Sequence, residues 1–297
     1  MRALLAKILV CLLMSGGPAF AHEVLVVQSL RVKPFDEALS GFKSVCKADS
    51  KRFVVSEMEG VNIVRTVHEE RPDLILAIGA DALERVKRIR DVPILYLMVL
   101  NPEKITGVGK NVSGVSMNFA PERYLGEMEK LNIPNLRVGI LYDPAKSGSE
   151  MGRIQQTARA MGIELAAREV RNTKEVPEQL ARMKGSFNVY WMLPDSTVVT
   201  PESVEFLLLF TQQNRIPVVT FARKYLEMGA LFSLDIDSFD MGKQAGEMAN
   251  KVLSRNDAAE LPKADARKAL IRINHKVAKK LGINVDFVGS STLSNPD

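Results

Sequence analysis

Short, continuous apolar runs alternate with longer amphipathic stretches through most of the chain, from residue 24 onward. The runs at 74–78 and 93–99 carry no polar alternation, which is typical of strands covered on both faces of a sheet. The stretches at 35–47 and 148–161 have the apolar spacing of helices. Repeated strand–helix units of this length predict parallel sheets, and therefore an α/β fold.

Two sheets are expected rather than one. The chain has 297 residues, and at roughly 100–200 residues per domain two domains are the natural division. Eight or nine strand candidates also exceed what one doubly wound sheet of modest size holds. A segment rich in Gly, Asn and Ser at 107–119 interrupts the alternation, so we expect the chain to pass from the first lobe to the second near 115–119.

The first 21 residues have the layout of a secretory signal peptide. Arg2 and Lys7 form a positive region, residues 8–14 form a short apolar core, and Ala19-Phe20-Ala21 matches a signal-peptidase site. The apolar core is far shorter than the roughly 20 residues that span a bilayer, which disfavours a membrane anchor. We therefore expect cleavage after Ala21, export to the periplasm, and a mature chain with Cys46 as its only cysteine.

The residues typical of catalysis or metal binding are sparse. His22, His68 and His275 lie far apart, and no Gly-x-Ser-x-Gly motif is present. Asp235 and Asp237 would lie on one strand, and the sequence shows no nucleophile paired with a base beside them. The net charge is only +5 and no run of five basic residues occurs, so nucleic-acid binding is also disfavoured. We expect a protein that is not an enzyme and holds no metal or cofactor.

Polar or small residues follow several predicted strands, at the point where the next helix begins. In parallel sheets, ligands bind at the carboxyl ends of the strands, and free N–H groups of helix N-termini lie there too. Each position taken singly is explained by helix capping, but six such positions together predict a cleft. The residues are Gln28, Ser29, Gly79, Ala80, Asn101, Asp143, Ser147, Asp195, Ser196, Phe221 and Arg223.

The order and spacing of several sequence segments are specific enough to indicate a known family. They include Asp-Leu-Ile-Leu-Ala-Ile-Gly-Ala at 73–80, the segment 138–149, and the segment 229–246 with its Ser-Leu-Asp-Ile-Asp-Ser-Phe-Asp core. With the signal peptide and two lobes, the chain resembles the substrate-binding proteins of ABC importers. The closest resemblance is to the type I periplasmic binding proteins of the uncharacterised ABC-type transport system periplasmic component family, and it extends over residues 24–283.

The resemblance implies two doubly wound, Rossmann-like lobes joined by a three-stranded hinge. The N-terminal lobe would comprise residues 22–117 plus 233–264, and the C-terminal lobe residues 118–232 plus 265–297. A small molecule would be enclosed in the interlobe cleft by hinge closure and delivered to an ABC permease, with the receptor a monomer. Carried over by position, the pocket residues are Gln28, Ser29, Gly79, Ala80, Asn101, Asn118, Asp143, Ser147, Asp195, Ser196 and Phe221, with Asp235 at the return hinge.

One departure bears on the ligand. Amino-acid-binding members of the family tend to carry an acidic and small-residue segment where this chain has residues 220–225, with Arg223 and Lys224. These residues would repel an ammonium group and favour a carboxylate or phosphate. Arg31 and Lys33 add positive charge in the first loop. An anionic or bulky organic ligand is therefore our hypothesis, and solvated surface charge is the alternative explanation of these basic residues.

A second function remains open for the same fold. The chain could present its ligand state to a membrane sensor, as a periplasmic ligand-sensing or partner-binding module. An exported enzyme would need a nucleophile paired with a base, and the sequence shows no such pair.

Overall fold

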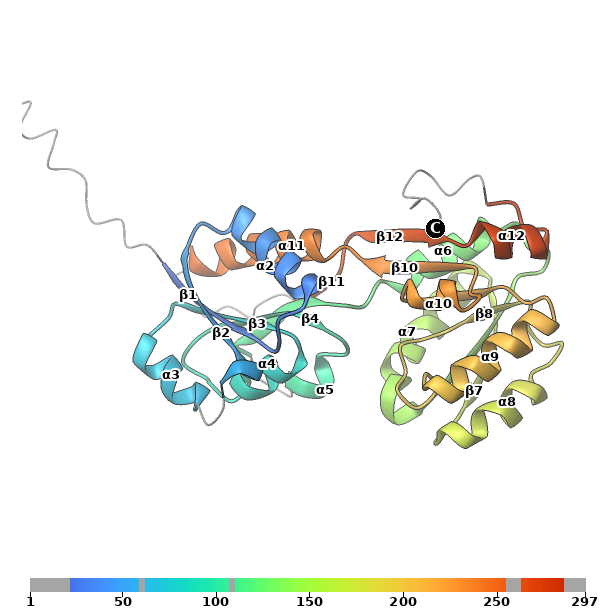
Figure 1. The fold of residues 1–297 in the computed structure, drawn as a ribbon, viewed down its shortest axis with the longest axis horizontal. Coiled ribbons are helices and arrows are strands. Elements are labelled where there is room, and N and C mark those ends of the chain that lie inside the picture. Colours follow the sequence, from blue (N-terminus) through green and yellow to red (C-terminus); the bar gives the residue numbers. More distant parts are fainter. Residues whose placement is uncertain (1–21, 59–61, 107–109, 255–262, 286–297) are drawn as a thin grey trace, which may run out of the picture. The chain divides into compact units, whose positions relative to one another are not determined.

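The computed structural model describes residues 22–58, 62–106, 110–254 and 263–285. The predicted signal peptide, with its cleavage site after Ala21, lies outside these residues. The chain divides into two compact units, of residues 1–117 with 238–264 and of residues 118–237 with 265–297. It therefore passes from one unit to the other three times (Figure 1).

The first unit is built on a six-stranded sheet in the order β11-β5-β4-β3-β1-β2. Strands β1 to β5 pair in parallel. Every residue of β3 and β4 is buried, as their continuous apolar sequences predict. The strands are β1 (Glu23–Gln28), β2 (Asp49–Val54), β3 (Leu74–Ile78), β4 (Ile94–Val99), β5 (Val112–Ser116) and β11 (Lys263–Asp265).

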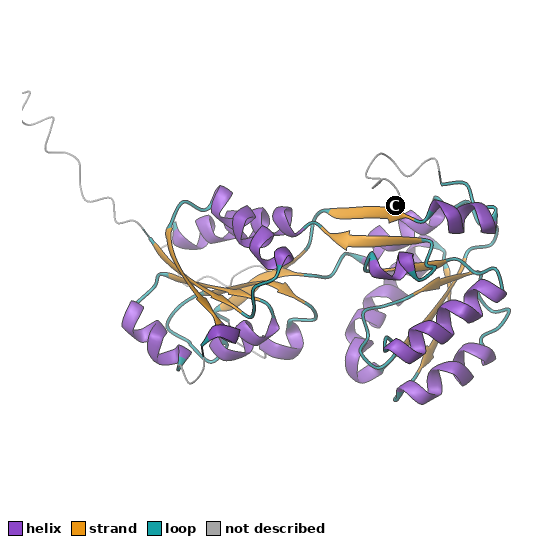
Figure 2. Ribbon diagram, viewed as in Figure 1, coloured by secondary structure: helices purple, strands orange, loops and turns teal. Residues whose placement is uncertain are grey.

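Helices α2 (Lys33–Val45) and α11 (Ser238–Leu253) of the first unit pack with their backbones in close contact. A Cβ atom on Gly41 would lie 2.0 Å from the carbonyl oxygen of Phe239, and one on Gly242 would lie 1.9 Å from that of Ala38. Only glycine permits this approach. The helices of the unit are α2 (Lys33–Val45), α3 (Ile63–Glu70), α4 (Ala80–Val86), α5 (Glu103–Thr106) and α11 (Ser238–Leu253), with a 3₁₀ turn η1 (Val55–Glu57) (Figure 2).

The second unit repeats the plan with a sheet in the order β12-β10-β9-β8-β6-β7. Strands β6 to β10 are parallel, and β12 runs antiparallel to β10. The strands are β6 (Arg137–Tyr142), β7 (Glu164–Glu169), β8 (Val189–Trp191), β9 (Val218–Thr220), β10 (Phe232–Ile236) and β12 (Ala269–Ile273).

Helices cover this second sheet and bury an apolar core. Tyr190, Leu207 and Leu180 belong to one core cluster that joins strands to helices α8 and α9. The helices are α6 (Pro121–Glu129), α7 (Pro144–Met161), α8 (Val176–Arg182), α9 (Pro201–Gln213), α10 (Lys224–Glu227) and α12 (His275–Leu281), with a 3₁₀ turn η2 (Thr173–Glu175). In the part of the chain that the structure describes, no helix has the length and apolarity to span a bilayer.

The two sheets confirm the predicted pair of doubly wound α/β lobes. One predicted boundary differs from the structure. Residues 233–237, assigned above to the first lobe, belong to the second unit, because β10 pairs with β9 and β12 in the second sheet. Asp237 also lies just beyond the end of β10 rather than on the strand.

Candidate functional site

Gln28 ends β1 and is fully buried. Its Nε2 atom donates to the Leu30 carbonyl oxygen at 2.8 Å and to Asp36 Oδ1 at 3.4 Å. Its Oε1 atom has no partner among the described residues. A buried acceptor without a hydrogen bond is unfavourable, so Gln28 offers an open acceptor at the carboxyl edge of the first sheet.

Ser29, Gly79 and Ala80 lie together beside Gln28 and shape the start of α4. The Ser29 hydroxyl accepts from the Ala82 N–H at 2.9 Å and so caps that helix. Gly79 has a φ of +92°, and a Cβ there would lie 2.5 Å from Ser29 Oγ. Ser29 and Gly79 are therefore occupied in holding the turn, while Ala80 is exposed.

Asn101 follows β4, where the backbone is irregular. Met98 and Asn101 have φ values of +56° and +48°, and the pairing of β4 with β5 shifts register between Tyr96 and Val99. Bulges of this kind redirect side chains at the ends of strands. Leu30 and Leu100, at the ends of β1 and β4, are 39% and 38% exposed, so this edge presents apolar surface.

In the second unit, Asp143 and Asp195 form one network. The Asp143 N–H donates to Asp195 Oδ2 at 2.8 Å, and Thr197 Oγ1 donates to Asp143 Oδ2 at 2.6 Å. Asp143 Oδ1 caps α7 by accepting from the Ala145 N–H, and Asp195 Oδ1 accepts from the Thr197 and Val198 N–H groups. Both carboxylates are buried, so they stabilise the loops of this edge.

Ser147, Ser196 and Phe221 lie at the same carboxyl edge in different environments. Ser147 is buried in the first turn of α7, whereas Ser196 is exposed. The Phe221 ring meets the Tyr225 ring edge-on, with centroids 5.3 Å apart, and packs against the core cluster. Asn118 lies at the first crossing of the chain, where its carbonyl oxygen accepts from the Ala266 N–H.

Asp235 is the carboxylate of this edge with an open oxygen. Arg272 Nε donates to Asp235 Oδ2 at 2.7 Å, but the buried Oδ1 has no partner among the described residues. Burial raises the pKa of Asp235, and the nearby Ser233 hydroxyl and the guanidinium groups of Arg272 and Arg223 partly oppose the rise. Asp235 Oδ1 is thus a second buried acceptor without a hydrogen bond of ordinary geometry, and the Ser233 hydroxyl lies nearby.

An aromatic cluster lies near Asp235 and was not predicted from the sequence. The Tyr124 ring lies 4.7 Å from the Trp191 ring and 6.2 Å from that of Phe119, and all three are buried. Burial raises the pKa of Tyr124, and the negative charges of Asp235 and Glu150 add to the rise. The available signal was the single Trp of the chain, at the end of an apolar run.

The basic residues that suggested an anionic ligand have local partners. Arg223 forms an exposed ion pair with Glu227 at 3.6 Å, and the Lys224 ammonium lies 4.8 Å from the centroid of the Tyr225 ring. In the first unit, Arg31 pairs with Glu57. Lys33 is 88% exposed. Arg223 also places positive charge near Asp235, whereas Arg31, Lys33 and Lys224 interact with residues close to them in sequence or in their own unit.

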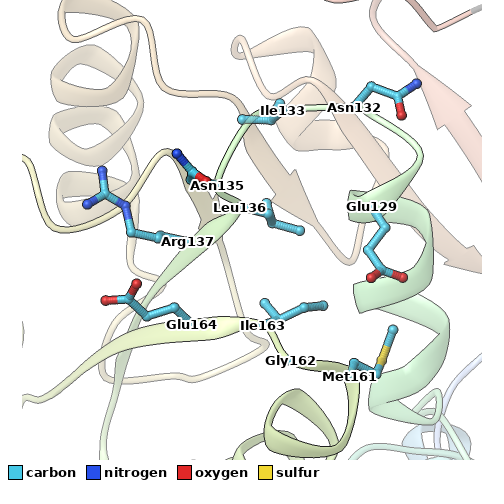
Figure 3. Close-up of a pocket in the computed structure, with 10 residues that line it drawn as sticks. All are labelled: Glu129, Asn132, Ile133, Asn135, Leu136, Arg137, Met161, Gly162, Ile163 and Glu164. Atoms are coloured by element: carbon cyan, nitrogen blue, oxygen red, sulfur yellow. The ribbon is translucent and has the colours of Figure 1, made fainter.

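A pocket of about 600 Å³ occurs elsewhere in the second unit, at the amino ends of β6 and β7 (Figure 3). None of the predicted site residues lines it. The lining residues are Glu129, Asn132, Ile133, Asn135, Leu136, Arg137, Met161, Gly162, Ile163 and Glu164. Over residues 22–58, 62–106, 110–254 and 263–285, no three His, Cys, Asp or Glu side chains gather as a metal site would require.

Comparison with known proteins decides the family. The model of the ABC transporter substrate binding protein family matches residues 38–287. The chain belongs to this family. It is 23% identical over 221 residues to the tyrosine-binding protein of Clostridioides difficile (strain R20291). That match spans 71% of this chain and 64% of the length of the relative.

Two solved structures share the fold of this family member. The ligand-free, open structure of a substrate-binding protein with adhesive properties from Clostridium difficile matches with a TM-score of 0.75 and 20% identity, over 93% of this chain and 100% of that one. An ABC domain in complex with L-Trp from Streptococcus pneumonia matches with a TM-score of 0.60 and 20% identity, over 90% and 96% of the two chains. The predicted family and fold are thereby confirmed.

Proposed function

We propose that this family member is a receptor that binds a small solute and delivers it to an ABC permease. Membership of the family carries the proposal, since the family model matches residues 38–287. The names of two similar proteins, one tyrosine-binding and one in complex with L-Trp, support a small organic solute. The receptor acts by binding rather than by turnover.

Two buried acceptors support a more specific proposal for the solute. Gln28 Oε1 in the first unit and Asp235 Oδ1 in the second each lie at the carboxyl edge of a sheet without a hydrogen-bond partner among the described residues. A buried carboxylate oxygen is best matched by a charged donor such as an ammonium group. Exposed Leu30 and Leu100 at the first edge favour an apolar body. The solute we propose therefore carries a protonated amine on an apolar or aromatic body.

This proposal replaces the anionic ligand suggested by Arg223 and Lys224. Both side chains have partners in or beside their own short helix, whereas Asp235 Oδ1 has no hydrogen-bond partner among the described residues. The ligand groups that complete the hydrogen bonds of this edge are donors. An anion would instead leave Asp235 Oδ1 unpaired and add repulsion.

Isothermal titration calorimetry with three related probes tests the solute class. L-tyrosine carries both charges, tyramine carries only the amine, and 3-(4-hydroxyphenyl)propionate carries only the carboxylate. We expect both amines to bind. Asp235→Asn should weaken their affinity about tenfold or more, because a charged hydrogen bond is lost.

Asp237→Asn is the matched control, since that carboxylate pairs with Lys268 at 2.7 Å just beyond the same strand. It should leave the affinity unchanged. Binding of the carboxylate probe alone, or equal affinities for the Asp235→Asn variant and the original chain, would reject the proposed solute class.

We also propose that the chain is exported and acts as a monomer. The signal-peptide pattern of residues 1–21 supports export. Mass spectrometry of the chain recovered from the periplasm of an expressing bacterium should then give His22 as the first residue.

A further inference from the structure

The pocket at the amino ends of β6 and β7 is built from four elements of the second unit. Glu129 ends α6, Arg137 begins β6, Met161 ends α7, and Glu164 begins β7. In a parallel sheet the amino and carboxyl ends of the strands lie at opposite edges. This pocket is therefore separate from the candidate solute site, which lies at the carboxyl edge of the same sheet.

The three charged side chains that line the pocket are unpaired. Arg137 Nε is buried and has no hydrogen-bond partner among the described residues. Within the same residues, neither Glu129 nor Glu164 forms an ion pair or a side-chain hydrogen bond, although Glu164 is the register partner of Arg137 across β6 and β7. An unmet buried donor is unfavourable, so an acceptor that reaches Arg137 would be stabilising in this pocket.

The wall that carries Arg137 is held rigidly. Asn188 Oδ1 accepts from the Arg137 N–H at 2.8 Å, and Asn188 Nδ2 donates to the carbonyl oxygens of Pro134 and Asn135 at 3.1 and 2.9 Å. Asn135 has a φ of +51°, the left-handed region that Asn tolerates. A wall held in this way lowers the entropic cost of binding.

Apolar side chains separate the charged side chains of the pocket. Figure 3 shows Leu136 and Ile163 between Glu129 on one side and Arg137 with Glu164 on the other. The volume of about 600 Å³ lies within the range of small-ligand sites. Two carboxylates and one guanidinium match a molecule with one amine and one single negative charge, and Glu164 beside Arg137 disfavours a multiply charged anion such as phosphate.

We propose that this pocket is a second ligand site, for a small amphipathic zwitterion. The anionic group of the ligand pairs with Arg137, an apolar stem covers Leu136 and Ile163, and the amine pairs with Glu129. The site does not depend on the proposed solute site, and it gives the receptor a second position at which a small molecule can bind.

The probe is 6-aminohexanoate, which carries a carboxylate and an amine at the ends of an apolar chain. Binding is followed in the full chain by NMR of ¹³C-methyl methionine, since Met161 lines the pocket and its signal is assigned by its loss in Met161→Leu. We expect a saturable shift of the Met161 signal. Hexanoate and hexylamine, which carry one charge each, should bind about tenfold more weakly.

Arg137→Gln keeps most of the side-chain stem. It should lower the affinity for 6-aminohexanoate about tenfold. Arg168→Gln makes the same exchange at an exposed position of β7 and should have no effect. Equal thermal unfolding of the two variants shows that the fold is intact. Asp235→Asn should leave the Met161 shift unchanged, so failure of this proposal and failure of the solute proposal are distinguishable.

A Met161 signal that does not move with 6-aminohexanoate overturns the proposal. So does a shift of equal affinity in Arg137→Gln and Arg168→Gln, or one that either singly charged probe reproduces at the same concentration.

Discussion

The two units share one strand order but use different means to build the carboxyl edges of their sheets. In the first unit, the side chains of Gln28 and Ser29 bond mainly to nearby backbone groups. In the second unit, buried carboxylates hold the edge through a network that links Asp143 with Asp195. The topology fixes where the strands end, and the backbone groups there are bonded by neutral side chains in the first unit and by carboxylates in the second.

The packing of the helices also differs between the two units. Gly41 and Gly242 let α2 and α11 approach with backbone contact in the first unit. Gly126 and Gly152, in α6 and α7 of the second unit, have no heavy atom within 4 Å of an added Cβ. Glycine is therefore required in the first unit's helix pair and replaceable in these second-unit helices.

The largest expected effect comes from Gly242→Ala. The new Cβ would lie 1.9 Å from the Ala38 carbonyl oxygen, so the helices must separate, at a cost of about 3 kcal/mol in the free energy of unfolding. Urea unfolding can be followed by circular dichroism for the whole chain and by the fluorescence of Trp191, the only Trp, for the second unit. The first unit should unfold at lower urea while the fluorescence transition keeps its midpoint.

Gly152→Ala is the control for this change. It lies in the interior of α7 with open space around it. It should raise the free energy of unfolding of the second unit by about 0.5–1 kcal/mol, as expected for Gly to Ala in a helix. Destabilisation by both variants would break the proposed difference between the units.

A smaller effect is expected from Asp195→Ala. The change leaves the buried Asp143 N–H and two further N–H groups without their acceptor, which should cost about 2–3 kcal/mol. The loss should appear in the Trp191 fluorescence transition. Ser196→Ala, at the exposed neighbouring position, should leave that transition in place, and a similar loss there would mean that the network is not the cause.

The smallest expected effect is on the pH dependence of stability. The pKa of one carboxyl in each unit is shifted, and the two shifts have opposite directions. For Asp36, burial raises the pKa, but the bonds from Arg52 and Gln28 outweigh it and lower the pKa below its usual range. For Asp235, burial dominates and the pKa is raised. The stability from Asp36 is therefore lost as the pH falls through its folded pKa, and that from Asp235 is lost as the pH rises through its folded pKa.

Carboxyl ¹³C NMR titration separates these two carboxyls. Asp235 should titrate above the ordinary value of 3.8 and Asp36 below it. The reverse order, or two coincident titrations, would remove this difference between the units.

The fold could be predicted from the sequence because short, continuous apolar runs such as residues 74–78, alternating with amphipathic stretches, are typical of strands covered on both faces. The same pattern indicates which residues lie at or follow the strand ends, such as Gln28, Asn101 and Asp143, and their part in ligand binding stays a prediction. Their roles were not all predictable, since whether Ser29 or Asp195 faces a ligand or a backbone N–H depends on neighbours far along the chain.

Two other features could not be predicted from the sequence, for physical reasons. Residues 233–237 read as the start of a new lobe because the pairing of β10 with β12 is not visible in the local pattern. The pocket around Arg137 escaped because its residues lie at strand starts and helix ends, where no spacing marks a common surface.

We propose that the chain binds a solute through Asp235 Oδ1, which lacks a hydrogen-bond partner among the described residues. The most direct test is the affinity of the full chain for L-tyrosine and L-tryptophan, measured side by side for the original sequence, Asp235→Asn and Asp237→Asn. We expect saturable binding of at least one of the two amino acids, weakened about tenfold or more in Asp235→Asn alone. Binding that survives unchanged in Asp235→Asn, or that appears only with amine-free acids, would contradict it.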